Sequence, residues 1–118
     1  GLEPTPELFI EHLVQVFREV RRVMRDDGVA WLNMGDSFND KQLLMMPHRL
    51  ALALQADGWW VRSDVVWAKP NPMPESVTDR PTSAHEHVFL LAPSAKYFYD
   101  AEAVSDNCGA KTNRNRCA

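Results

Sequence analysis

The order in which helix-like and strand-like patterns follow one another places this chain in the α/β class. An amphipathic helix is predicted from Thr5-Pro6-Glu7, a favourable helix start, to Asp27-Gly28. The next stretch, Val29–Leu32, is apolar throughout, as in a strand that is covered on both faces. The remaining predicted elements are a helix from Pro47 to Gly58 and strands at Trp60–Lys69, His85–Leu91 and, shorter, Tyr97–Tyr99.

Two polar loops are expected at one edge of the sheet. Because a helix separates the strand at 29–32 from the strand at 60–69, we expect these two strands to be parallel neighbours. The strand at 85–91 follows without a helix and is expected to run antiparallel to the second. Ligands of open α/β sheets bind beyond the carboxyl ends of the parallel strands. The loops at that edge run from Asn33 to Asp40 and from Lys69 to Ala84.

The second loop contains three prolines within five residues, at positions 70, 72 and 74. Proline fixes the backbone and restricts its neighbours, so a rigid loop holds Lys69 and Asn71 with little ordering cost on binding. The alternative is a stiff connection that only crosses the end of the sheet. Both interpretations remain open from the residues alone.

Composition and charge set the outer bounds on function. A chain of 118 residues with 45% hydrophobic and 25% charged residues is expected to form one globular domain. The net charge of -3 means that any nucleic-acid contact is local, and no apolar run is long enough to span a bilayer. We therefore expect a cytoplasmic protein with reduced thiols at Cys108 and Cys117. Residues 107–118 contain no acids, which predicts a domain over 1–106 followed by an irregular basic tail.

Three stretches closely resemble bacterial and phage site-specific DNA methyltransferases, which act on the exocyclic amino group of adenine or cytosine. They are GLEPTPELFIEHLVQVFREVRRVMRDDG at 1–28, LNMGDSF at 32–38, and ALALQADGWWVRSDVVWAKPNPMPESVTDRPTSAHEHVFLLAPSAKYFYDAEAV at 51–104. The resemblance implies a partial Rossmann-like fold, with a mixed sheet and an antiparallel last strand. It also implies S-adenosylmethionine as methyl donor and double-stranded DNA as substrate, with the target base flipped out of the duplex.

Two loops of that family do not occur in this sequence. One is (Ser/Asp/Asn)-Pro-Pro-(Tyr/Phe), which binds the target amine, and the other is Phe-x-Gly-x-Gly, which cradles the cofactor. The link from Ser37 to Leu43 is also shorter than expected for the family. We therefore expect the sequence to be a segment of such an enzyme, or several ordered segments of it joined together, and to be inactive on its own. The alternative is a non-catalytic DNA-binding or assembly module derived from the family.

By position, the resemblance places nine residues beside DNA or the target base: Asn33, Gly35, Asp36, Lys69, Asn71, Pro72, Arg80, His85 and Glu86. It implies proximity to the site and assigns none of them a catalytic or cofactor-binding role. Plainer interpretations exist for several. Asp36 would cap a following turn, Lys69 and Arg80 would be solvated surface charges, and Arg80 would pair with Glu86.

A metal-dependent hydrolase is the competing class of function. His85 and His87 project from the same face of a predicted strand, with Glu86 between them. Since no third clear ligand accompanies the two histidines, no metal site is expected. The tryptophans are expected mostly in the core or at an interface, although an exposed one stacks readily on a base: Trp31, Trp59, Trp60 and Trp67.

The resemblance also predicts an open strand edge. In the family fold, the strand from Val29 to Asn33 is flanked by the strand that leads into the Pro-Pro-aromatic loop, and this sequence lacks that neighbour. An apolar edge strand leaves backbone groups unpaired and invites strand pairing. We therefore expect the chain to associate either with a second copy, as a two-fold dimer, or with a missing segment of the same enzyme.

Overall fold

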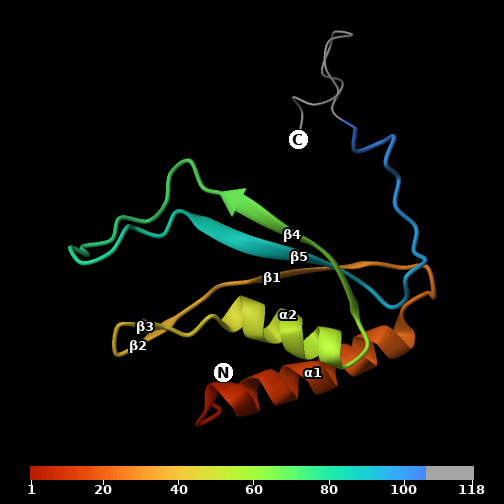
Figure 1. Ribbon diagram of the computed structural model, residues 1–118, viewed down its shortest axis with the longest axis horizontal. Coiled ribbons are helices and arrows are strands. Elements are labelled where there is room, and N and C mark those ends of the chain that lie inside the picture. The colour runs from red at the N-terminus through yellow and green to blue at the C-terminus, as the bar shows by residue number, and fades with distance from the viewer. Residues whose placement is uncertain (106–118) are drawn as a thin grey trace, which may run out of the picture.

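The computed structural model describes residues 1–105, and in it two helices lie side by side on one face of a three-stranded sheet (Figure 1). The helices are α1 (Pro6–Val23) and α2 (Met46–Ala56), and the sheet contains β1 (Ala30–Met34), β4 (Trp60–Ala68) and β5 (His85–Ala92). A small hairpin of β2 (Phe38–Asn39) and β3 (Gln42–Leu43) follows β1. The predicted basic tail at 107–118 and both cysteines lie outside the described residues.

Both helices begin where the sequence predicts. The Thr5 hydroxyl accepts the Leu8 backbone N–H at 3.2 Å and caps α1, while Pro47 occupies the first turn of α2. Gly58 has a φ of +99°, which a side chain would strain, and it follows the end of α2. α1 ends at Val23, earlier than the predicted Asp27-Gly28, because Met24 is already extended. Neither helix of residues 1–105 is long and apolar enough to cross a membrane.

The sheet has the order β1-β5-β4, and β5 runs antiparallel to both of its neighbours. The predicted antiparallel pairing of the last two strands is therefore confirmed. The prediction that the first two strands are neighbours is wrong, because β5 lies between them, although β1 and β4 do run in the same direction. Hydrophobic periodicity and helix order give the direction of a strand but leave its partner open, and β5 offers a second edge on which β1 pairs.

The core lies between the helices and one face of the sheet. Fully or almost fully buried side chains meet there from both helices, from the sheet and from the residue before β4: Ile10 of α1, Leu50 and Leu54 of α2, Phe89 and Leu91 of β5, and Trp59. The opposite face carries Trp31, Trp60, Val65 and Trp67, each between 42% and 58% exposed. Of the four tryptophans only Trp59 is in the core, and the other three lie on the sheet face opposite to it.

Two further features of the chain depart from simple strand patterns. A register shift between Val61 and Ser63 forms a bulge in β4, so Val61 joins the helix-covered face while Ser63 lies on the other, although regular alternation would place these two residues on one face. Tyr97–Tyr99 forms no strand. Instead the Tyr97 hydroxyl accepts from Arg62 Nε at 3.0 Å, and the Phe98 backbone N–H donates to the Asp27 carbonyl at 2.8 Å.

Asp57, directly after α2, joins the two helices. Its carboxylate accepts from Arg18 Nε and Nη2 of α1 at 2.9 and 2.7 Å, and its carbonyl accepts from Arg21 Nη1 at 2.9 Å. The hydrogen-bonded Arg18 guanidinium holds the pKa of Asp57 below its ordinary value of 3.8. The carboxylate thus stabilises the fold in its charged form.

We expect Asp57→Asn to lower the free energy of unfolding at pH 7 by about 1 kcal/mol, because a charged two-point hydrogen bond is lost from a partly solvated site. Since the folded-state pKa is depressed, this contribution is present above the ordinary value and disappears as the pH falls below it. Urea unfolding at pH 7 and pH 3 measures the difference. The exposed Asp26, changed to Asn, is the control, and an equal effect of both substitutions would contradict the role of Asp57.

Candidate functional site: a cleft at the carboxyl ends of β1 and β4

A cleft of about 690 Å³ opens where β1 and β4 end and β5 begins. Its wall combines the loop after β1, the first turn of α2, the loop between β4 and β5, and the first residues of β5. Both polar loops extend from this end of the molecule (Figure 1). The antiparallel β5 brings them together, because its amino end lies against the carboxyl end of each neighbour.

Asp36 holds the loop after β1 against α2. Its Oδ1 accepts the backbone N–H of Ser37 at 2.8 Å and that of Met46 at 3.0 Å. Met45, the residue at the helix cap, has a left-handed backbone and supplies no side-chain hydrogen bond. Asp36 therefore serves one of the N–H groups that the first turn of α2 leaves free. The plainer interpretation of Asp36, a capping side chain, agrees with these contacts.

Asn33, Glu86 and Lys69 form a polar network on the uncovered face of the sheet, at the rim of the cleft. Glu86 accepts from Asn33 Nδ2 at 3.2 Å and from the Lys69 ammonium, and Asn33 Nδ2 also donates to the His87 carbonyl. The Lys69 ammonium first, and then the Asn33 amide, hold the pKa of Glu86 below its ordinary value of 4.5. Lys69 is thus an ion-paired side chain rather than a freely solvated one.

Arg80 is held inside the proline-containing loop. Its Nη1 donates to Glu75 Oε2 at 2.9 Å and to the Pro81 carbonyl at 3.0 Å, and its guanidinium lies 4.4 Å from the centre of the Phe38 ring. Glu75 also accepts the Ser83 N–H, and these two contacts lower its pKa. The expected alternative pair of Arg80 with Glu86 is therefore wrong, since each residue has a different partner.

The contacts of Arg80 and Lys41 join the loop after β1 to the loop after β4. Arg80 reaches Phe38 of β2, and Lys41 Nζ lies 2.9 Å from Asp79 Oδ2. Asp40 and Lys41 both have positive φ, as in the tight two-residue turns that close β-hairpins. This hairpin was not anticipated from the sequence, which has no glycine at that turn.

The nine residues singled out by sequence divide into three groups. Gly35, Asp36, Arg80, His85 and Glu86 line the cleft. Asn33 and Lys69 reach its rim through Glu86. Asn71, which is exposed, and Pro72, which is partly buried, lie in the loop outside the lining of the cleft.

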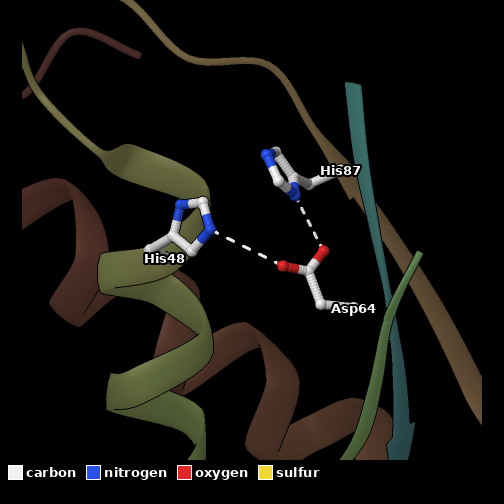
Figure 2. A group of neighbouring side chains, drawn as sticks. All are labelled: His48, Asp64 and His87. Carbon is white, nitrogen blue, oxygen red and sulfur yellow. Dashed lines mark hydrogen bonds and ion pairs between the residues drawn. The ribbon is translucent and has the colours of Figure 1, made fainter. Parts of the chain in front are cut away.

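The histidines on β5 do not form the grouping considered for a hydrolase. His85 and His87 share a face, with ring centres 5.3 Å apart, but Glu86 points to the other face and binds Lys69. The structure instead brings His87 together with Asp64 of β4 and His48 of α2 (Figure 2). Sequence reasoning missed this grouping because it depends on the strand register and on where α2 crosses the sheet. Alternation along each strand was the only sequence signal for it.

Comparisons with known proteins agree on one family. The family model for DNA methylase matches residues 2–117. Type II methyltransferase M.Cfr9I of Citrobacter freundii is 42% identical over 145 residues, covering 98% of this chain and 48% of the relative. M.SmaI of Serratia marcescens is 41% identical over 135 residues, covering 90% and 46%, and M.SfiI of Streptomyces fimbriatus is 46% identical over 121 residues, covering 88% and 29%.

The chain thus spans slightly less than half the length of M.Cfr9I and of M.SmaI, and under a third of the length of M.SfiI. The match to M.Cfr9I extends over 145 residues although this chain has 118, so the relative carries additional residues inside the matched region. Among solved structures, the M1.HpyAVI–SAM complex superposes with a TM-score of 0.57 at 18% identity. It covers 75% of this chain and 42% of that one. This likeness supports the expected partial Rossmann-like fold.

We expect Asp36→Ala to destabilise the protein by about 0.5–2 kcal/mol, the range for losing a helix-capping acceptor. Urea unfolding followed by circular dichroism measures this change. Asp36→Asn is the matched control, because its amide oxygen accepts the same two backbone N–H groups without the charge. If the Asn and Ala variants lose equal stability, the capping interpretation is contradicted.

Proposed function

Since the chain belongs to the DNA methylase family, we propose that it supplies one wall of the active site of a site-specific DNA amino-methyltransferase. The reaction moves a methyl group from S-adenosylmethionine to the exocyclic amino group of adenine or cytosine in double-stranded DNA. The observation that carries the proposal is the family match over residues 2–117, together with the cleft at the carboxyl ends of β1 and β4. A restriction-modification setting is part of the proposal, because the relatives are named type II methyltransferases.

The cleft offers cationic side chains that are held in place yet retain free donors. An ammonium group has three N–H donors, and Glu86 occupies one of those on Lys69. In Arg80, Nη1 makes both hydrogen bonds seen within residues 1–105, which leaves Nε and Nη2 available. Their carboxylate partners fix the positions of the two cations, so they can meet phosphate oxygens without a large cost in side-chain entropy. We propose that Lys69 and Arg80 position DNA at the cleft.

We propose no cofactor cradle among the described residues. A cradle that brings backbone close to a ligand needs glycine where a side chain would collide, but a Cβ placed on Gly35 in the cleft would meet nothing within 4 Å. The sequence also contains no Gly-x-Gly. S-adenosylmethionine would supply an electrophilic methyl group to the complete enzyme, and we assign no step of its chemistry to these residues.

The uncovered face of the sheet supports a role as part of a larger assembly. Within residues 1–105, β1 pairs only with β5 and has a free edge, and Trp31 and Trp67 are more than half exposed. We propose that the remainder of a methyltransferase covers these surfaces, either as further chain or as a second subunit. A non-catalytic DNA-binding module derived from the family is the second candidate, and the absence of both family loops from this sequence favours considering it.

We expect the 118-residue chain alone to transfer no methyl group to DNA, because neither the amine-binding loop nor the Gly-x-Gly loop is in its sequence. Incubation with radiolabelled S-adenosylmethionine and mixed-sequence duplex DNA measures this, with a complete type II methyltransferase as the positive control. Labelling clearly above a protein-free reaction would show that these residues suffice for catalysis.

We expect Lys69→Ala and Arg80→Ala to weaken duplex binding and to reduce the slope of log affinity against log salt by about one each, since each phosphate contact releases counterions. Fluorescence anisotropy of a labelled duplex at several salt concentrations measures both quantities. Lys96→Ala, beyond the opposite end of β5, and Arg22→Ala on α1 are the matched controls. Equal salt slopes for the cleft variants and the controls would remove the DNA-positioning role.

A further inference from the structure

Three side chains of types that can bind metal ions converge beside the cleft, each from a different element, and two of them, His48 and His87, line it. His48 lies in the first turn of α2, Asp64 in the middle of β4 and His87 near the start of β5 (Figure 2). One donor atom from each lies within 4.8 Å of the other two. We propose that this group, the His48–Asp64–His87 cluster, binds a divalent transition-metal ion such as zinc.

The strand register places two of the three ligands. Asp64 is opposite Phe89, and His87 is opposite Val66, so Asp64 and His87 are diagonal neighbours on the helix-covered face. Their side chains meet, with His87 Nδ1 2.7 Å from Asp64 Oδ1. This contact leaves Asp64 Oδ2 directed towards α2 (Figure 2).

His48 completes the cluster at a separation that suits two ligands of one ion. Its Nε2 lies 3.7 Å from Asp64 Oδ2, which is too long for a hydrogen bond. Two atoms bound tetrahedrally to one zinc ion at about 2.1 Å are roughly 3.4 Å apart. A small movement of either side chain would therefore bring both atoms to an ion placed between them.

The surroundings of His48 favour a metal over a hydrogen-bonded strut. Within residues 1–105 neither of its ring nitrogens makes a hydrogen bond, and the buried Nδ1 has no partner. The ring is positioned by aromatic packing, with its centre 4.6 Å from that of His87 and 5.7 Å from that of Phe89. A metal ion would give Nε2, the ring nitrogen that faces Asp64, a partner that the protein does not supply, while Nδ1 would stay without one.

The donor set selects the class of ion. Two imidazole nitrogens and one carboxylate oxygen suit zinc and neighbouring first-row metals, whereas magnesium and calcium prefer oxygen ligands. Three protein ligands leave a fourth position for water or another small ligand. Because His48 and His87 both line the cleft, that position would be reached from it. The ion would also link α2 to two strands of the sheet.

Isothermal titration of zinc into the complete 118-residue chain tests the proposal. The thiols of Cys108 and Cys117 bind zinc well, so both are first changed to Ser. We expect one zinc ion to bind per chain. Zinc should bind at least about tenfold more weakly to His48→Gln and to His87→Asn, because even the loss of a residue that only supports a metal ligand lowers metal affinity about tenfold. At the same zinc concentration, the melting temperature should also rise more for the Cys→Ser chain than for these variants.

His12→Gln is the matched control. His12 also pairs with a carboxylate, Glu3, at 3.0 Å, but it does not belong to the His48–Asp64–His87 cluster. It should bind zinc as the parent does. Circular dichroism reports whether each variant folds, and cobalt(II) absorption of the parent reports nitrogen and oxygen coordination without any further substitution. Absence of saturable zinc binding by the parent, or binding unchanged in both cluster variants, would overturn the proposal. No DNA or methyl donor is involved, so the outcome is independent of the proposed methyl transfer.

Discussion

The position of β5 between β1 and β4 determines where everything else in this structure lies. Phe89 and Leu91 of this strand are at most 3% exposed and provide the surface on which both helices pack. Because β5 is antiparallel to both neighbours, its first residues lie beside the last residues of β1 and β4. The cleft, the polar network of Glu86 and the cluster that includes His87 all follow from that single arrangement.

The charged residues around the cleft are mostly paired with one another. Three ion pairs form there: Lys69 of the second loop with Glu86 of β5, Arg80 with Glu75 inside the second loop, and Lys41 with Asp79 between the two loops. These pairs are partly exposed, so each contributes little to overall stability. Their effect is instead to hold the loops in one arrangement, which reduces the entropy lost when a ligand binds. A protein with a net charge of -3 can in this way present local cations to an anionic partner.

The sequence predicted the elements well and their neighbours poorly. The starts of α1 and α2 and the extents of β4 and β5 follow from caps, prolines and hydrophobic alternation, all of which are local signals. The partner of β1 could not be predicted in the same way, since it depends on which edge of β5 is free. The bulge at Val61 and Ser63 shifts the faces of β4, and no glycine or proline marks it. The same limit explains why the His48–Asp64–His87 cluster was missed, because it depends on the register of β4 and β5 and on where α2 packs over the sheet.

For the candidate site, the two loops were predicted to lie at the same edge of the sheet. The contact between Arg80 and Phe38, which joins the two loops, was not predicted.

On the sheet face that the helices leave uncovered, β1 and β4 carry large apolar side chains that are about half exposed in residues 1–105. On β1, Leu32 and Met34 face the helices, while Trp31 faces away and is 53% exposed. On β4, Val65 and Trp67 face the same way as Trp31.

A sheet with one solvated face normally alternates apolar and polar residues, whereas a sheet covered on both faces is apolar on each. Large aromatic side chains on an open face are favoured where another surface will bury them. The residues of this sheet are thus suited to a third layer. The curated relatives, which are about twice as long as the region they share with this chain or longer, have enough additional chain to provide one.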